Sequence, residues 1–343
     1  MKEKPKIRKR DYNLEFIRMV SFLFVIAIHV TNYFCRAYGE ISAGEYYFSL
    51  VLDTVARVSV PCFFMITGAL LLGREEPLEK HVRRLLRFVV ALVVWSIVYY
   101  LWNTFYMKTP YDLGDILYVP AEPHLWYLYA MIPIYLVIPF LQVMCRFMGI
   151  KLEYAFLAVI SVTTIFNYVS SLVHEEAYYD LPLIGDKVYM YYVFIGYYIY
   201  RYRKHIRLGQ RTAFLIFAAN MAAVFGITAG MTVQTGEHCE KVLEYGCPFI
   251  VAGSAAFFLW AIRFKKCRFE PEGRLKSWID RICSCSFGIY LIHILFLDNY
   301  KKYMEPGDFT AWAAIPLLII GIAAVSYVSV FLIRKCSWGR QIT

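Results

Sequence analysis

Charged residues are scarce in this sequence. They make up 18% of its 343 residues, whereas hydrophobic residues make up 59% and aromatic residues 18%. A soluble globular chain carries roughly 25% charged and about 45–50% apolar residues. The charges also gather in short runs that leave long uncharged stretches between them. This composition excludes a soluble, secreted, fibrous or disordered protein and is typical of a chain that crosses a membrane several times.

No connector in the sequence is long enough for a soluble domain. The sequence also contains no internal repeat and no low-complexity tract. A helix needs about 20 mostly apolar residues to cross a hydrocarbon core of ~30 Å. We therefore predict an all-α membrane protein of about ten spans, at 13–34, 47–72, 85–106, 124–144, 152–171, 183–201, 212–233, 246–264, 284–300 and 311–333. The sixth and ninth spans have the weakest pattern. Residues 1–343 are expected to form a single membrane-embedded domain, with tails at 1–12 and 334–343.

No cleavable signal peptide is indicated, because the first apolar segment is too long, contains Arg18 and His29, and has no A-x-A site after it. Lys and Arg set the orientation, since they gather in cytoplasmic connectors. With an inside N-terminus, the inner connectors and tails hold 27 of the 36 Lys and Arg, and the outer connectors hold six. Both termini are therefore predicted to be cytoplasmic. The net charge of +10 is a topological and anionic-lipid signal and indicates no nucleic-acid partner.

The nine cysteines show neither a C-x-x-C motif nor any other metal-ligand spacing. Cys239 and Cys247 share an outer loop and could form a disulfide; alternatively, all nine cysteines are packing residues. The sequence predicts no metal site and no permanently bound cofactor.

Ionisable residues in the first span are the first functional signal, because such groups are costly in hydrocarbon. Arg18 and His29 are eleven residues apart, which is about three helical turns, so they share one face about 16 Å apart. Arg18 could bind a phosphate near the cytoplasmic end, and His29 could act as a general base deeper in the membrane. Alternatively, Arg18 reaches the lipid headgroups and His29 hydrogen-bonds a neighbouring helix.

The second span contains an acidic and a basic residue four positions apart, Asp53 and Arg57, which can pair within the helix. Asp53 is expected at a depth similar to that of His29, where it could orient the imidazole. Pro61 and Gly68 are compatible with a kink in this span, which neighbouring helices can accommodate.

Later spans contain three further groups of candidates. Arg84 and Arg87 share a face at the inner end of the third span and could hold a phosphate or form an ordinary positive-inside cluster. His124 and Trp126 begin the fourth span at the outer surface, where aromatic residues often form an interfacial belt. His293 lies in the middle of the ninth span and could act in catalysis or in helix packing.

Five segments, in this order, resemble the acyltransferase 3 family of bacterial membrane enzymes, and in particular its surface-polysaccharide O-acetyltransferase branch. They are Asn13–Arg18 leading to His29, Arg57–Gly68, His124–Tyr127, Tyr191–Tyr197 and Ser286–His293. The family often has Asp where this chain has Glu15 and Ser where it has Thr67, and both replacements keep the chemistry.

The resemblance implies a multi-pass enzyme of the bacterial cytoplasmic membrane that transfers an acyl group, usually acetyl, from cytoplasmic acyl-CoA to a hydroxyl of an envelope glycan or lipid-linked sugar. His29 would be the general base or the acyl acceptor. The resemblance implies a catalytic role for His29, Asp53 and Arg57. It implies donor binding by Arg18, Glu15, Arg84 and Arg87. It implies substrate binding by His124, Trp126, Ser59, Thr67, Tyr290 and His293.

Two other classes of function stay open. The protein could be a transporter or flippase for a lipid-linked sugar, although transporters often contain paired, Gly/Pro-interrupted halves and no such repeat is visible. It could also be a non-catalytic envelope subunit, which would need neither Arg18 nor His29. Labelling of a glycan that depends on acyl-CoA distinguishes the enzyme from both.

Overall fold

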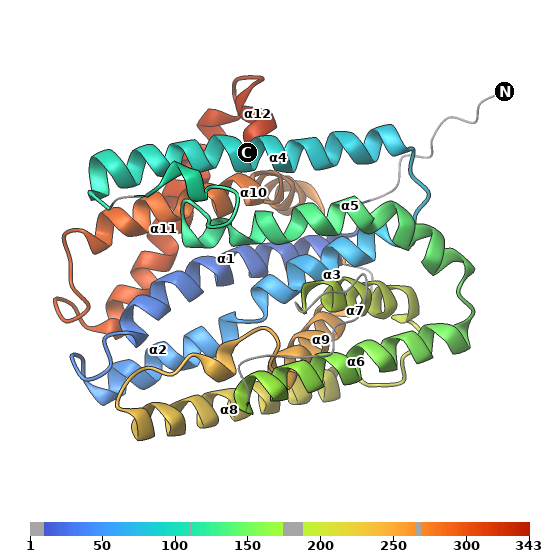
Figure 1. The fold of residues 1–343 in the computed structure, drawn as a ribbon, viewed down its shortest axis with the longest axis horizontal. Coiled ribbons are helices and arrows are strands. Elements are labelled where there is room, and N and C mark those ends of the chain that lie inside the picture. The colour runs from blue at the N-terminus through green and yellow to red at the C-terminus, as the bar shows by residue number, and fades with distance from the viewer. Residues whose placement is uncertain (1–9, 110, 174–187, 265–268) are drawn as a thin grey trace.

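The computed structural model describes residues 10–109, 111–173, 188–264 and 269–343, and the regular structure of these residues is helical (Figure 1). The α-helices are α1 (Tyr12–Cys35), α2 (Ala43–Ala56), α3 (Ser59–Leu71), α4 (Leu78–Leu101), α5 (Trp126–Phe147), α6 (Ile150–Val173), α7 (Tyr189–Tyr202), α8 (Gln210–Thr235), α9 (Pro248–Ile262), α10 (Gly273–Lys301), α11 (Ala311–Ile333) and α12 (Gly339–Ile342). Four short turns adjoin them: η1 (Trp102–Met107, π-helical) and the 3-10 turns η2 (Leu113–Asp115), η3 (Pro123–Leu125) and η4 (Lys241–Leu243).

Nine helical segments of the described chain are long and apolar enough to cross a membrane. The predicted all-α polytopic membrane fold is therefore confirmed. The sixth predicted span corresponds to α7, whose 14 described residues are too few to cross a membrane alone; its predicted first five residues, 183–187, lie outside the described residues. The ninth span, which looked short, extends inward along a charged segment to give the 29-residue α10.

The second predicted span is divided into two helices rather than kinked. α2 ends at Ala56 and α3 begins at Ser59, with Arg57 and Val58 between them. Pro61 explains the position of this break, because its ring nitrogen has no hydrogen to donate to the carbonyl of Arg57 one turn earlier. The break therefore places the Arg57 side chain at a helix terminus within the bundle.

Gly68, which was expected to contribute to the kink, instead allows α3 to contact α7. A Cβ atom on Gly68 would lie 1.8 Å from the carbonyl oxygen of Val193, and one on Gly196 would lie 2.1 Å from the carbonyl oxygen of Met65. The two backbones thus touch through glycine, as small residues permit in membrane helix pairs. This crossing holds the short α7 against the centre of the bundle.

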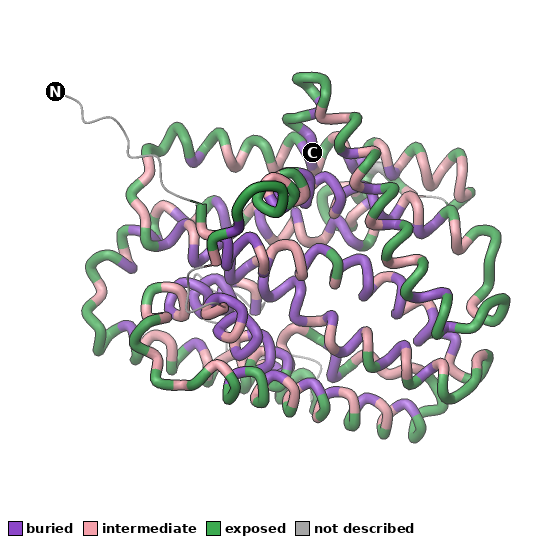
Figure 2. Tube along the Cα trace, turned by 180° about the vertical axis from the view of Figure 1, so that it is seen from behind, coloured by how far each residue is buried: buried purple, intermediate pink, exposed green. Residues whose placement is uncertain are grey.

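α1 occupies the centre of the fold, in contact with α2, α3, α9, α10 and α11. α4 and α5 run along one side of the molecule and α6 and α8 along the other (Figure 1). The buried residues concentrate toward the middle of the fold, and the outer helices are largely exposed (Figure 2). On α4, Leu86, Val90, Val93 and Ile97 recur every three or four residues and are all exposed. Such an apolar stripe fits contact with lipid.

Contacts between chain segments define the two ends of the bundle. At one end, Arg10 binds Asp280 at 2.8 Å, which joins the start of α1 to the first part of α10. At the same end, Asn13 donates to the carbonyl of Phe264 at 2.8 Å, which joins α1 to the end of α9. At the opposite end, Asn32 donates to Glu240 at 2.9 Å. We call these the inner and outer ends, following the orientation that the Lys and Arg distribution predicts.

Candidate functional site

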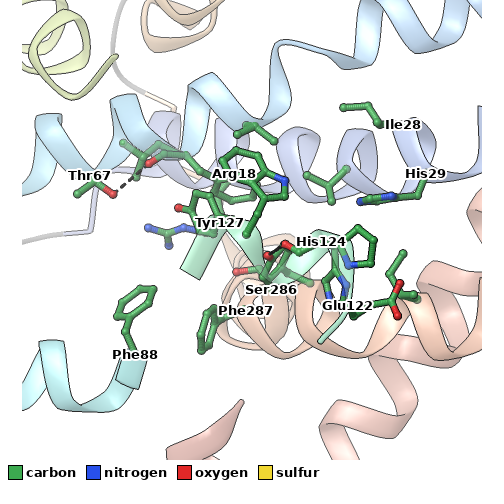
Figure 3. A pocket seen from close by; sticks show the side chains of 18 of the residues that line it. Arg18, Ile28, His29, Thr67, Phe88, Glu122, His124, Tyr127, Ser286 and Phe287 are labelled. Atoms are coloured by element: carbon green, nitrogen blue, oxygen red, sulfur yellow. Dashed lines mark hydrogen bonds between the residues drawn. The ribbon is translucent and has the colours of Figure 1, made fainter. Parts of the chain in front are cut away.

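A cavity of 860 Å³ lies between α1, α3, α4, α5 and α10. It is lined at its inner end by arginines, in its middle by aromatic rings and at its outer end by histidines and further charged residues. Nine of the residues singled out from the sequence line it: Arg18, His29, Arg57, Thr67, Arg84, Arg87, His124, Trp126 and Tyr290. Figure 3 shows this lining from close by, with Thr67, Arg18 and Phe88 toward one end and His29, His124 and Glu122 toward the other.

Each inner arginine is held by an acceptor. Arg18 binds Glu15 on the preceding turn of α1 at 2.6 Å, and Arg84 binds Glu76 at 2.8 Å. Burial would raise the pKa of Glu76, but the hydrogen bond and charge of Arg84 lower it below its usual value. Glu76 is therefore a carboxylate at neutral pH. An anionic ligand that binds Arg84 therefore has to displace Glu76 or bind the guanidinium group alongside it.

Arg87 was predicted to act together with Arg84, but the structure gives it a different partner. Its guanidinium donates to the backbone oxygen of Thr343 at 2.8 Å, and Arg334, absent from the predicted site, donates to the same oxygen at 2.6 Å. Both arginines line the inner end of the cavity. They add positive charge there.

Aromatic side chains line the middle of the cavity. The rings of Phe63 and Tyr127 lie 6.2 Å apart, and those of Tyr127 and Tyr290 lie 5.5 Å apart. The Tyr290 hydroxyl donates to the backbone oxygen of His124, which ties α10 to the turn before α5. This part of the lining offers an apolar passage between the arginines and the histidines.

Three imidazole rings meet toward the outer end, from three separate elements. The ring centroids of His29 and His293 are 5.2 Å apart, those of His124 and His293 5.4 Å, and those of His29 and His124 6.4 Å. His124 and His293 are 2% and 0% exposed, whereas His29 is only partly buried and opens to the cavity. Among the described residues, no His, Cys, Asp or Glu group is arranged to hold a metal ion. The accessible imidazole of the three is His29.

Asp53 does not orient His29, contrary to the sequence-based expectation. Its carboxylate is 0% exposed and accepts hydrogen bonds from Thr31 at 3.1 Å and from Arg57 at 3.0 Å. The second Arg57 contact to Asp53 is an ion pair of 2.9 Å. Asp53 lies outside the cavity lining and Arg57 within it, so the carboxylate fixes the arginine and not the imidazole.

Three further predicted residues lie behind the lining: Glu15, Ser59 and His293. Glu15 holds Arg18, and the Ser59 hydroxyl is buried with no hydrogen-bond partner among the described residues. The Thr67 hydroxyl lines the cavity but donates to the carbonyl of Phe63 at 3.0 Å. Among the predicted groups for a developing negative charge, Arg57 is therefore the charged residue of the cavity lining, and its Nε and Nη2 atoms bind Asp53.

The sequence reading missed several outer residues of the lining, notably Glu122, Asp298 and Lys301. Glu122 precedes η3 and was assigned to a connector, whereas Asp298 and Lys301 lie in the last turn of α10. Their proximity in the sequence to His124 and His293 was the available signal. The outer cysteines Cys239 and Cys247 are both free thiols.

The carboxyl group of Glu122 should link stability to pH. Burial and nearby Asp298 raise the pKa of Glu122 to about 7, although Asn103 and Lys301 act in the opposite direction. An unfolded glutamate titrates near pH 4.3. Between these values the folded chain keeps a proton that the unfolded chain releases, so stability falls as the pH rises, by about 4 kcal/mol at most for this group.

Thermal unfolding in detergent tests this linkage. The Glu122→Gln variant should match the parent near pH 5 and unfold at a higher temperature than the parent near pH 8. Glu40→Gln, at an exposed outer carboxylate, is the control and should show no such divergence. A difference between Glu122→Gln and the parent that stays constant across this range would contradict the raised pKa.

Comparisons with known proteins identify a family. The family model described as an acyltransferase domain, Acyl_transf_3, matches residues 11–334. No curated protein and no solved structure matches the chain.

Proposed function

Since the chain belongs to the acyltransferase 3 family, and is thus a membrane acyltransferase, we propose that it transfers an acetyl group from cytoplasmic acetyl-CoA to a hydroxyl of a surface polysaccharide or another envelope glycan. In this proposal the protein resides in the bacterial cytoplasmic membrane and uses acyl-CoA as a substrate, not as a bound cofactor. One observation carries the proposal. A single cavity joins the arginines at the inner end to His29 near the outer end.

The inner arginines suit the donor's phosphates. Guanidinium groups form strong, charge-assisted hydrogen bonds with phosphate oxygens, and Arg18 and Arg84 line the cavity at the cytoplasmic end. The pantetheine arm would follow the aromatic passage past Tyr127. The axial distance of about 16 Å between Arg18 and His29 on one helix is a length that such an arm can bridge.

The transfer step then needs a base near the thioester. His29 takes the proton of the acceptor hydroxyl, the oxygen attacks the thioester carbonyl carbon, and the carbon–sulfur bond breaks. The proton passes from His29 to the departing sulfur, so CoA leaves as a thiol and the acetyl ester stays on the glycan. Arg57, fixed by Asp53, stabilises the negative charge on the carbonyl oxygen in the transition state. Acetylation of His29 before the acceptor arrives is the alternative order of events.

Inside-out membrane vesicles with radiolabelled acetyl-CoA outside test the proposal. Label should enter the glycan fraction of vesicles that contain the protein, and free CoA should appear in equal amount. Right-side-out vesicles and vesicles without the protein are the controls and should remain unlabelled. Equal labelling in both orientations would contradict a cytoplasmic donor. Movement of a lipid-linked sugar without any release of CoA would contradict the enzyme and support a transporter.

A further inference from the structure

We propose that Glu122 and Asp298 form the acceptor site at the outer end of the cavity, and that this site binds the hydroxyl groups of a neutral sugar. This inference rests on the proposed acyl transfer and adds the substrate class. The two carboxyl groups come from different elements, the segment before η3 and the last turn of α10, and both line the cavity together with His124. The proposed donor path uses neither of them.

Glu122 is held in place while part of its carboxyl group stays available. The Asn103 side chain donates to Glu122 Oε2 at 3.1 Å and to the carbonyl of Ala121 at 3.0 Å, which fixes the segment before η3. Within the described ranges, neither Glu122 nor Asp298 forms an ion pair, and Lys301 beside them forms none either. Carboxyl oxygens that line a cavity in this way can accept hydrogen bonds from a ligand.

A nearby side chain also lacks partners. His124 is 2% exposed and lines the cavity, yet neither of its ring nitrogens has a hydrogen-bond partner in the described structure. The Trp102 indole lies beside Asp298 and interacts with its carboxyl group. Buried polar groups normally have partners. A ligand hydroxyl can both donate and accept, so it can complete the bonding of the carboxyls and of the His124 nitrogens.

The charge at this end of the cavity indicates which sugars fit. Glu240 is engaged by Asn32 and Arg36, and Arg57 is engaged by Asp53. At pH 8, above the pKa of about 7 of Glu122, the charges that remain are those of Glu122, Asp298 and Lys301, two acidic groups against one basic group. An acceptor with its own carboxylate at this position would be repelled by them, whereas a neutral sugar would not.

Purified protein in lipid nanodiscs, supplied with acetyl-CoA at pH 8, where Glu122 is ionised, provides the test. The acceptors are the methyl β-glycosides of glucose, galactose and mannose and the matching uronides, and free CoA thiol is the readout. The parent should use at least one neutral glycoside at least about tenfold better, in kcat/KM, than its uronide. Glu122→Gln and Asp298→Asn should each raise the KM for that glycoside about tenfold and leave the KM for acetyl-CoA within about twofold. Glu40→Gln, at the exposed outer carboxylate, should change neither constant.

The outcomes separate this inference from the proposed function. An active parent whose two variants keep the acceptor KM, or an active parent that prefers uronides, overturns the acceptor site and leaves acyl transfer standing. A parent that neither binds acetyl-CoA nor releases CoA with any acceptor overturns the transfer reaction, and the acceptor site with it. Size-exclusion profiles of both variants identify one that fails to fold, and the other carboxyl then decides the result.

Discussion

Replacement of His29 by glutamine is expected to lower the turnover number by a factor of about 10²–10⁴, the usual contribution of a histidine base. Glutamine keeps a hydrogen-bonding side chain of similar length but accepts no proton. The residue is partly open to the cavity and has no structural ion pair among the described residues. The variant should therefore accumulate in the membrane as the parent does, with a similar KM for acetyl-CoA.

The matched control is His205→Gln, because His205 is an exposed histidine between α7 and α8, away from the cavity. It should retain parental turnover. His124→Gln and His293→Gln, which alter the two buried neighbours, distinguish the base from its surroundings. Full turnover by His29→Gln would remove His29 from the mechanism. A loss confined to His293→Gln would transfer the role of base to that residue.

Removal of Arg57 is expected to produce the largest loss of stability of any single change considered for this protein. Asp53 is 0% exposed, and Arg57 supplies its ion pair at 2.9 Å. Breaking a buried pair by removing one partner typically costs about 3–5 kcal/mol, because the other charge stays buried. Arg57→Ala should therefore unfold at lower temperature or denaturant concentration and should also lose turnover, since Arg57 stabilises the transition state in the proposed mechanism.

A double substitution separates the two roles of Arg57. Asp53→Asn combined with Arg57→Ala removes the uncompensated charge and should regain much of the stability, while turnover stays low. Unfolding in detergent and single-turnover acetyl transfer measure the two quantities on the same preparation. Recovery of turnover along with stability would show that Arg57 acts only as a structural partner of Asp53.

The sequence predicted the fold correctly wherever the length of an apolar segment identifies a membrane span. The spans around α1, α5, α6 and α11 were predicted to within a few residues, because a predominantly apolar helix of membrane length has few alternatives. The break at Arg57–Val58 depends on a missing hydrogen bond donor at Pro61, and the prediction of a kink underestimated it. Gly68 was assigned to the same kink because its contact with α7 depends on tertiary packing that helical periodicity does not contain.

The candidate site was predictable where residues share a helix and not where they meet across helices. Arg18 and His29 lie on one face of α1, so helical geometry alone placed both toward one cavity. Glu122 and Asp298 are far apart in the sequence and meet only because the turn before α5 packs against the end of α10. Asp53 was predicted to orient His29 because the two residues lie at similar depths. Depth along a helix does not show toward which neighbouring helix a side chain points.

The placement of Arg18 and His29 at different depths on α1 also means that the donor's charged and reacting parts lie at different depths in the membrane. In the proposed mechanism the phosphates of CoA remain with the inner arginines, the acetyl group that passes outward is neutral, and the hydroxyl proton leaves inward as part of the thiol. No net charge then crosses the bilayer, whereas moving one elementary charge would involve about 2.3 kcal/mol per 100 mV of membrane potential. Acyl transfer by this protein would thus proceed equally well across an energised and a depolarised membrane.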